Sequence, residues 1–468
     1  MRVCIINEFF YPDETGGTGT VLSELAAALR RDFPDVQIDV ITSVNLYRAQ
    51  TVRLDAYEEW ENTRIFRLPT PHASFRSTRH RLAANAKFGL AALGKLLRLG
   101  RYDLVLIGTA PPTLAMVASA YKALTKTPYL YVVYDLDPDR AVQMGVLPAR
   151  SPITRLLRSW QKSWMKKADQ VVVLGRCMRE YVMRHYDLPP EQVQVIPIGG
   201  DHEAIQPLSP RTRFRAAHSL NGFVVCYSGN FGRYHDFDTV LDAAKHLQTA
   251  EPTVQFALVG GGAQKEHIER RVREEQIGNV TLLPFVPKED YSDLLASADV
   301  SLVTLEPGME GLCVPSKFYS ILASGRATIA TVSAGSEVAR VLAEAGCGLQ
   351  VAQGDAAYLV RAVSHLLHHP AETARMGCNA RAVLEEKYTN RHVAALYYQA
   401  MCRATHHSFS PATLPISVAR LPTSGVFRYA SPDDAEKKAA VATTAASPSL
   451  PPCSRPSVHN FAQKDTRS

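Results

Sequence analysis

Hydrophobic residues along the chain form two alternating patterns, short uninterrupted runs and longer segments with helical spacing. The runs of the first half are RVCIIN (2–7), IDVIT (38–42), RIFRL (64–68), DLVLIG (103–108), YLYVVYD (129–135), QVVVLG (170–175) and VQVIPIGGD (193–201). Between the first two runs, Val21, Leu22, Leu25 and Leu29 form one apolar helix face. Apolar strands that alternate with helices predict a parallel sheet covered on both faces.

The second half repeats this organisation without a convincing sequence repeat. Its runs are GFVVCYSGN (222–230), VQFALVGGG (254–262), NVTLLPF (279–285), DVSLVTL (299–305), ATIATV (327–332) and CGLQV (347–351). We therefore predict two doubly wound, Rossmann-like α/β domains at 1–200 and 222–390, joined by a connector at 201–221. A C-terminal helix at 391–406 follows, and the Ser-, Pro- and Ala-rich segment 407–468 is predicted to be a disordered tail.

The composition indicates a globular protein without membrane spans. Of the 468 residues, 46% are hydrophobic and 21% charged, and no run of about 18 uncharged apolar residues occurs. The N-terminal MRVCIINEFF predicts a first strand, which argues against a secretory signal. The eight cysteines form no CxxC pair, which favours reduced thiols and a cytoplasmic location.

The formal net charge of +7 is unevenly distributed. No acid occurs between Glu61 and Asp103, whereas 64–101 carries Arg64, Arg67, Arg76, Arg79, Arg81, Lys87, Lys95, Arg98 and Arg101. This segment fits either an anionic membrane surface at the inner face of the cytoplasmic membrane or a helix packed on a sheet with its basic side in solvent. Nucleic-acid binding is disfavoured, because no aromatic interleaving or known module accompanies the charge.

Several glycine-bearing loops fall at the carboxyl ends of predicted strands, where open parallel sheets bind ligands. In YPDETGGTGT, Thr15, Gly16, Gly17 and Thr18 precede the first helix, and a plain tight turn explains them equally well.

Two more such loops open the second half. In YSGNFGRYHDF, Gly229, Asn230 and Arg233 stand before a helix, and Arg233 fits either a diphosphate or solvent. Gly260 begins a third loop of the same strand–turn–helix form.

The stretch EGLCVPSKFYSILASGRA (310–327) gives the most specific indication of a binding site. Pro315 fits a first helical turn, so Ser316 and Lys317 are predicted at a helix N-terminus, with Ser320 on the same face. Lysine, hydroxyl and helix dipole together favour a phosphate. Glu306 and Glu310 in the preceding loop are candidates to accept hydrogen bonds from sugar hydroxyls.

The motif DLDPD contains Asp135 and Asp137 in a DxD arrangement that some sugar transferases use to hold a divalent metal. In those transferases the motif lies in a single nucleotide-binding domain. Here it lies in the first of two predicted domains. We therefore expect no metal here, and Asp135, at the carboxyl end of its strand, is predicted to face the reacting sugar.

Taken together and in order, these motifs identify a resemblance. FFYPDETGGTGTVLSELAAAL, ADQVVVLGRCMREYV, VQVIPIGGD, YSGNFGRYHDFDTVLDAA, ADVSLVTL and VPSKFYSILASGRATIA resemble family 4 of the nucleotide-sugar glycosyltransferases, which have the two-domain GT-B architecture. The resemblance covers residues 1–404. VVYDLDPDRAVQMGVL and PSKFYSILASGRA are similar to the bacterial branch that makes O-antigen and capsule.

The sequence departs from the family at two glutamates. Counting back from Gly325, their places hold Leu312 and Ser320. The resemblance implies that Glu310 substitutes for the first, which serves the donor sugar, and that Ser320 makes a weaker ribose contact. His235 stands near an expected lysine, and Asp135 lies nearest the place of a family histidine.

The resemblance implies a retaining transferase that moves a sugar from a UDP-linked donor to a glycan or polyprenyl-diphosphate-linked acceptor, with no metal or other cofactor. Lys317, Arg233 and Asp135 are the expected catalytic residues. Thr15, Gly16 and Thr18 are expected on the acceptor side. The expected donor-site residues are Gly17, Gly229, Asn230, Arg233, Gly260, Glu310, Ser316, Lys317 and Ser320. A UDP-sugar 2-epimerase of the same architecture and a non-catalytic nucleotide-sugar-binding protein stay open as alternatives.

Overall fold

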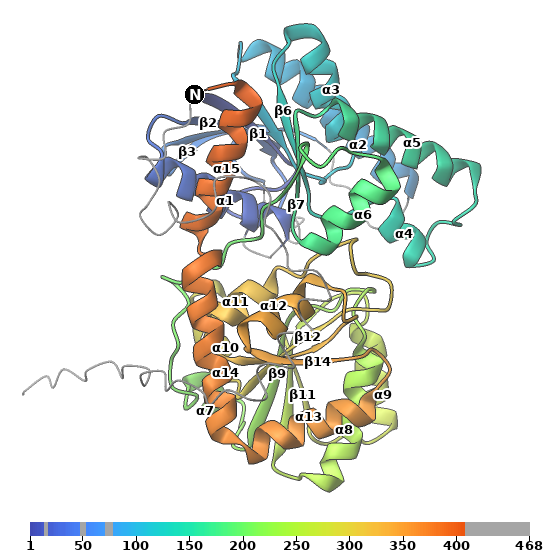
Figure 1. The fold of residues 1–468 in the computed structure, drawn as a ribbon, viewed down its shortest axis with the longest axis vertical. Coiled ribbons are helices and arrows are strands. Elements are labelled where there is room, and N and C mark those ends of the chain that lie inside the picture. Colours follow the sequence, from blue (N-terminus) through green and yellow to red (C-terminus); the bar gives the residue numbers. More distant parts are fainter. Residues whose placement is uncertain (14–16, 47–52, 71–77, 408–468) are drawn as a thin grey trace, which may run out of the picture. The chain divides into compact units, whose positions relative to one another are not determined.

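The protein contains two β-sheets of mainly parallel strands, each covered by helices (Figure 1). The computed structural model describes residues 1–13, 17–46, 53–70 and 78–407. The two sheets have eight and six strands, and the fold class predicted from the sequence is confirmed.

The first sheet has the strand order β3-β4-β2-β1-β5-β6-β7-β8, in which all neighbours except β3 and β4 are parallel. Its strands are β1 (Arg2–Ile6), β2 (Gln37–Ser43), β3 (Tyr57–Trp60), β4 (Thr63–Leu68), β5 (Leu104–Ile107), β6 (Tyr129–Val133), β7 (Gln170–Val173) and β8 (Val193–Val195). Its helices are α1 (Thr18–Asp32), α2 (Thr78–Arg98), α3 (Leu114–Thr125), α4 (Asp139–Gln143), α5 (Pro152–Lys167) and α6 (Arg176–Tyr186).

The strands that the apolar runs predicted form the buried interior of this sheet. Every residue of β5 and β6 is buried, as expected for strands covered on both faces. The antiparallel edge strand β3 was not predicted, because its sequence YEEW is polar and half of its residues are exposed. Pairing with β4 holds β3 in the sheet, and the side-chain pattern of β3 gives no sign of this pairing.

The second sheet has the order β11-β10-β9-β12-β13-β14 and is parallel throughout. Its strands are β9 (Phe223–Asn230), β10 (Val254–Gly261), β11 (Val280–Leu283), β12 (Val300–Thr304), β13 (Ala327–Thr331) and β14 (Gly348–Val351). The helices after β8 are α7 (Arg213–Ala217), α8 (Phe237–Ala250), α9 (Lys265–Glu274), α10 (Lys288–Ala296), α11 (Lys317–Ala323), α12 (Glu337–Ala345), α13 (Ala356–His368) and α14 (Pro370–Val383).

The last helix of the described chain returns to the first domain. After α14, the π-helical turn η1 (Leu384–Tyr388) leads into α15 (Asn390–Thr405), which packs against α1 (Figure 1). The rings of Phe33 and Tyr398 stack with centroids 4.2 Å apart, and the Tyr398 hydroxyl donates to Asp35 over 3.0 Å. The C-terminal helix is therefore part of the core of the first domain.

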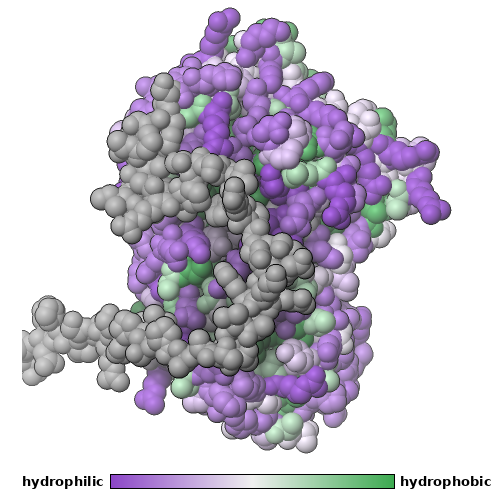
Figure 2. All heavy atoms as spheres, viewed as in Figure 1, coloured by the Kyte–Doolittle hydropathy of each residue, from purple (hydrophilic) through white to green (hydrophobic). Residues whose placement is uncertain are grey.

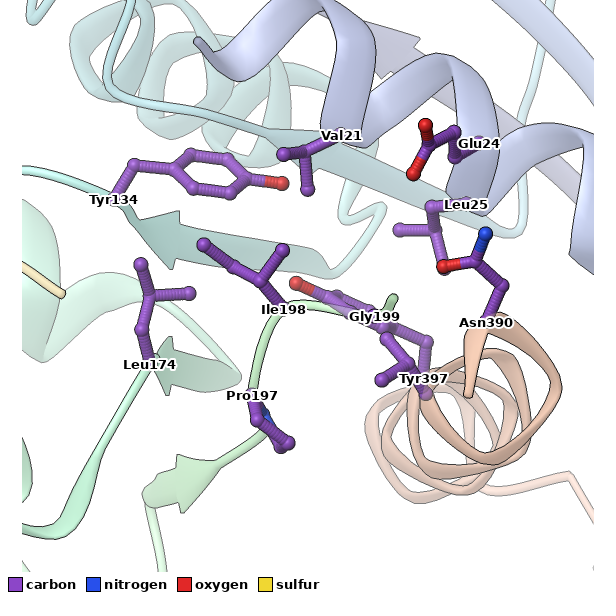
Figure 3. A pocket seen from close by; sticks show the side chains of 11 residues that line it. Val21, Glu24, Leu25, Tyr134, Leu174, Pro197, Ile198, Gly199, Asn390 and Tyr397 are labelled. Atoms are coloured by element: carbon purple, nitrogen blue, oxygen red, sulfur yellow. The ribbon is translucent and has the colours of Figure 1, made fainter. Parts of the chain in front are cut away.

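The chain crosses between the two sheets twice at neighbouring points. Gly200 N donates to Tyr388 O over 2.8 Å, and a Cβ on Gly199 would lie 2.1 Å from Asn390 Oδ1. A cavity beside this crossing is lined by residues of α1, α15 and the segment 197–199 (Figure 3). Its volume of about 10 Å³ holds no more than one water molecule, so it is too small for a sugar.

Asp39, on β2, is the buried acid that joins three neighbouring strands of the first domain. Its carboxylate accepts from Arg64 Nε (2.7 Å), Arg2 Nη2 (3.0 Å) and the Tyr102 hydroxyl (2.7 Å). Burial alone would raise the pKa of Asp39, but these hydrogen bonds outweigh it and lower the pKa. Arg67, also on β4, has its side chain 1% exposed and pairs with Glu58 at 2.6 Å. Arg64 and Arg67 thus serve the sheet and are not part of a free basic face.

We expect Asp39→Asn to lower the free energy of unfolding by about 3 kcal/mol, because it leaves buried donors with a weaker partner. Since the folded pKa is lowered, the wild-type contribution is present above the unfolded pKa of about 3.9 and is lost as pH falls through the folded pKa. Urea unfolding followed by circular dichroism measures this, with Glu289→Gln on α10 as a control that changes stability by less than about 0.5 kcal/mol. Equal losses in the two variants would contradict this role.

Candidate active site

The carboxyl ends of β9 and β10 present bare backbone, because glycines stand there in register. Gly229 pairs with Gly260, and their φ angles are 132° and 146°, in the region that favours glycine. A Cβ on Gly260 would lie 1.9 Å from the Gly229 carbonyl oxygen, so no side chain fits between the strands. A ligand can therefore approach the main chain closely at this edge.

The ammonium of Lys317 lies directly beside Gly229. A Cβ on Gly229 would be 3.0 Å from Lys317 Nζ, and Nζ stands 3.6 Å from the centroid of the Tyr227 ring. This nitrogen is buried and has no hydrogen-bond partner among the described residues. Burial holds the pKa of Lys317 well below its usual range. The ring face offers some attraction to the cation but no hydrogen bond.

The loops after β9 and β10 are tied together by one side chain. Gln264 Nε2 donates to the carbonyl oxygens of Gly232 and His235, both over 2.7 Å. Gly232 N donates to His235 Nδ1 over 3.1 Å, so this ring nitrogen is an acceptor. Burial, reinforced by nearby Lys317, lowers the pKa of His235 well below its usual range and favours the neutral imidazole.

The loop between β12 and α11 supplies carboxylates to the same region. Ser333 donates to Glu310 Oε2 over 3.0 Å, and Gln353 donates to the Ser333 hydroxyl over 3.3 Å. Burial, with Asp236 and Asp238 nearby, raises the pKa of Glu306. Glu310 is thus held in place from a neighbouring strand end.

The helix that follows differs from the sequence-based prediction. It begins at Lys317, so Pro315 lies before it, and it is only seven residues long. Ser316 is the exposed N-cap residue and makes no side-chain capping bond, whereas the Lys317 side chain points inward to Tyr227. The argument for a phosphate therefore rests on the buried amino group of Lys317 and not on a helix dipole.

The places of the two family glutamates are occupied differently. Leu312 is buried at 3% exposure and packs in the core, so it offers nothing to a donor. Ser320 lies on α11 and shares a hydrogen bond with Tyr291, which also bonds Ser228 at the end of β9.

Asp135 follows β6 and is held by an arginine. Arg140, on α4, contacts Asp135 Oδ1 at 2.6 Å and Asp137 Oδ2 at 3.0 Å. Burial raises the pKa of Asp135, and the charge of Arg140 opposes this rise. Leu136 N donates to Leu312 O over 2.9 Å, so the DLDPD segment lies against the loop that carries Glu310.

The remaining predicted residues are found at several places. Asn230 is exposed at the end of β9, and Arg233 is exposed and forms no ion pair within the described ranges. Gly17 is the N-cap residue of α1, with φ 83°, and the Thr18 hydroxyl accepts from Asn7 over 3.3 Å. Thr15 and Gly16 lie outside the described residues.

Sequence reasoning did not assign Tyr227, Gln264, Ser333 or Arg140 to this region. Each acts by placing another residue: Tyr227 lies under Lys317, Gln264 joins two loops, Ser333 holds Glu310, and Arg140 holds Asp135. Only Tyr227 was accessible to inference, since it lies two residues before Gly229 on the same strand face.

Within the described residues no group of three or more His, Cys, Asp or Glu is arranged to hold a metal ion. A search of the same residues for a helix long and apolar enough to cross a membrane finds none.

Comparison with protein families decides what this pair of domains is. Residues 16–199 match the glycosyl transferase 4-like domain, and residues 209–383 match the glycosyl transferases group 1 domain. The chain belongs to the family 4 glycosyltransferases. It is thus a glycosyltransferase of the GT-B type.

Two curated relatives agree with this assignment. WbjE of Pseudomonas aeruginosa, described as a probable glycosyltransferase, is 28% identical over 62% of this chain and 72% of its own length. WcaI of Escherichia coli (strain K12), whose name places it among the glycosyl transferases of colanic acid biosynthesis, is 24% identical over 71% of this chain and 83% of its own.

Solved structures show the same fold. Sucrose-phosphate synthase from Thermosynechococcus elongatus aligns with a TM-score of 0.71 and 20% identity, over 87% of this chain and all of its own. Anabaena HepE, solved in complex with UDP and glucose, aligns with a TM-score of 0.65 and 14% identity over 86% of this chain and 99% of its own.

We expect Lys317→Met to be more stable than the wild type near neutral pH, because it removes a buried nitrogen that has no partner. Since the folded pKa is lowered, the unfolded wild type binds more protons. The stability of the wild type therefore rises with pH, by up to about 1.4 kcal/mol per pH unit, towards the unfolded pKa of about 10.4.

The difference between the two proteins should accordingly shrink as pH rises. Urea unfolding of both proteins across neutral and alkaline pH measures it, and all other titrating groups cancel in the comparison. A difference that stays constant with pH would contradict the lowered pKa of Lys317.

Proposed function

We propose that the protein is a retaining glycosyltransferase that moves a sugar from a UDP-linked donor to a glycan or lipid-linked glycan acceptor. The observation that carries the proposal is the buried Lys317 nitrogen, which lies beside Gly229 of β9 and has no hydrogen-bond partner in the part of the chain that the structure describes. A buried amino group without a hydrogen-bond partner in the described part of the chain, beside glycines that let a ligand approach the main chain, suits a diphosphate.

Neutralising the leaving diphosphate is the main catalytic task in this proposal. Negative charge grows on the diphosphate as the glycosidic bond breaks, and a cation fixed in a desolvated site stabilises that charge strongly. Lys317 supplies this charge once the bound diphosphate favours its protonated form, and exposed Arg233 adds a second cation when the donor binds. Since two side chains supply the positive charge, the proposal includes no metal cofactor.

The proposal assigns the other donor contacts as follows. Glu310, already oriented by Ser333, accepts from hydroxyls of the donor sugar, and Ser320 binds the ribose. Gly17, Gly229, Asn230, Gly260 and Ser316 line the approach of the diphosphate. UDP is the proposed nucleotide because HepE, which has the same fold, was solved in complex with UDP.

Asp135 is proposed to serve the reacting sugar. Retention in this proposal comes from attack on the face that the diphosphate leaves, so Asp135 orients the acceptor or stabilises positive charge and forms no covalent bond. Thr15, Gly16 and Thr18 are proposed on the acceptor side. A polyprenyl-diphosphate-linked acceptor would place the enzyme in the cytoplasm, at the inner face of the membrane.

One observation favours a second candidate, a non-catalytic nucleotide-sugar-binding protein. Leu312 is buried where many relatives have a donor-binding glutamate. Donor binding without turnover would support this reading.

The deciding measurement is UDP release from a panel of UDP-sugars with a membrane extract as acceptor. We expect acceptor-dependent release that falls by about 100-fold to 1000-fold in Lys317→Met, because the charge that stabilises the leaving group is lost. Lys245→Ala, an exposed lysine on α8, is the matched control and should keep wild-type rates.

Three results would overturn the proposal. Equal rates in Lys317→Met and the wild type would remove the phosphate role of the lysine. UDP-sugar consumption without any acceptor would indicate an epimerase. Binding of UDP-sugars without release by any acceptor would indicate a binding protein.

The stereochemistry of transfer gives an independent test. We expect the product of an α-linked UDP-sugar to be an α-glycoside, detected from the anomeric coupling constant by NMR. Asp135→Asn should lower kcat by about 100-fold with donor affinity unchanged, because its carboxylate acts on the reacting sugar and not on the nucleotide. A β-linked product would exclude retention.

A further inference from the structure

Three adjoining helices on the first domain contain no acidic residues. Helix α3 packs against both α2 and α5. The sequences of these helices contain five Lys or Arg on α2, one on α3 and five on α5, and no Asp or Glu. We call the surface of these helices the α2–α3–α5 face.

Large hydrophobic side chains are concentrated on the same face. Of the twelve that the described residues expose, seven lie on these three helices, namely Leu90, Leu97, Met116, Leu124, Ile153, Leu156 and Trp160. Single exposed hydrophobic residues are normal on a protein surface, but a cluster of this size on adjoining helices indicates an interaction site.

Helix α5 shows how the two properties combine. Its buried side is formed by Thr154, Gln161 and Met165. Ile153, Leu156 and Trp160 are 65%, 48% and 48% exposed, and their spacing places them on one stripe away from that side. Figure 2 shows hydrophobic side chains next to strongly hydrophilic ones over α5.

Part of the positive charge on the face is unpaired. On α5, Arg158 pairs with Asp139, and Lys162 and Lys166 pair with Asp187. Four other basic residues are exposed and form no ion pair within the described ranges: Lys87 and Arg98 on α2, and Arg155 and Lys167 on α5.

We propose that the α2–α3–α5 face docks on an anionic lipid bilayer. Exposed leucine, isoleucine and tryptophan enter the headgroup boundary, and the surrounding lysines and arginines bind lipid phosphates. The excess of exposed, unpaired lysine and arginine on this face fits a surface of uniform negative charge. The inference rests on the membrane part of the proposed function and deepens it by naming the face, but it requires no particular donor.

The structure changes the extent of the surface that the sequence suggested. Arg64 and Arg67 belong to the sheet, while α5, outside the predicted segment 64–101, contributes three exposed hydrophobic residues. The acid-free helices meet only in the folded chain.

Tryptophan fluorescence tests the proposal directly, because two of the three tryptophans of the chain, Trp160 and Trp164, lie on α5. With phosphatidylglycerol-containing vesicles we expect a blue shift and quenching by brominated lipid. The Trp160→Phe/Trp164→Phe variant, which keeps only Trp60, should still float with the vesicles but show neither effect.

Flotation with vesicles measures the contributions of contact and charge. The wild type should bind phosphatidylglycerol-containing vesicles at low salt, much less at high salt, and pure phosphatidylcholine vesicles weakly. Leu156→Ser/Trp160→Ser should reduce the lipid partition coefficient by about tenfold or more. The control Leu208→Ser/Tyr358→Ser removes two equally exposed residues elsewhere and should bind like the wild type.

The contribution of positive charge is tested with a second variant and its matched control. Arg155→Gln/Lys167→Gln should weaken binding to anionic vesicles, whereas Arg213→Gln/Arg273→Gln, exposed residues of the second domain, should not. Circular dichroism confirms folding of each variant, and UDP release with a soluble acceptor shows separately whether transfer itself occurs.

Failure to bind anionic vesicles, or equal binding by the α5 variants and their controls, overturns the proposal whether or not UDP is released. A wild type that dimerises through this face and stays off vesicles, with the Leu156→Ser/Trp160→Ser variant monomeric, also overturns it and indicates a protein interface. Vesicle binding without UDP release would support the docking face and count against the transferase.

Discussion

A primary amine buried without a hydrogen-bond partner costs free energy, and Lys317 is placed in that condition by its surroundings. Gly229 leaves the space that Nζ approaches, and Nζ lies over the face of the Tyr227 ring. Gln264 fixes the two loops that border this space. The structure therefore keeps a poorly solvated amino group at the carboxyl ends of the strands, beside a glycine that leaves the main chain uncovered. An anion that brings its own oxygen acceptors would relieve the cost, which links the stability of the fold to the chemistry of the site.

The loop from β12 to α11 shows how the structure accommodates the departure of the sequence from its family. It packs Leu312 into the core and pairs its main chain with the DLDPD segment through Leu136. That pairing leaves Glu310, two residues earlier, held by Ser333 at the strand ends. This position is why Glu310, and not Leu312, is the carboxylate proposed to serve the donor sugar. Arg140 completes the arrangement by holding Asp135 and Asp137 on the other side of the pairing.

How much was predictable from the sequence depends on whether a feature is local. The buried strands are recognisable in the sequence as apolar runs. The edge strand β3 is not, because its side chains are polar and its pairing with β4 is a tertiary contact. Lys317 was identified from its place before an apolar helix, but its burial against Tyr227 was not, because the two lie 90 residues apart in the chain. Arg64 and Arg67 looked like part of a basic surface for the same reason: Asp39 and Glu58 become their partners only in the folded sheet.

The protein thus uses positive charge in two physically different ways. On the α2–α3–α5 face, lysines and arginines remain hydrated, so their attraction for an anionic surface is screened by salt within about 10 Å. At Lys317 the nitrogen is desolvated, so salt screens it little and its protonation is set by burial. Because hydration separates the two, raising the salt concentration acts on the surface charges while leaving the buried one almost unaffected. An effect of salt on lipid-linked acceptors that spares soluble ones would therefore arise at the surface and not at the diphosphate.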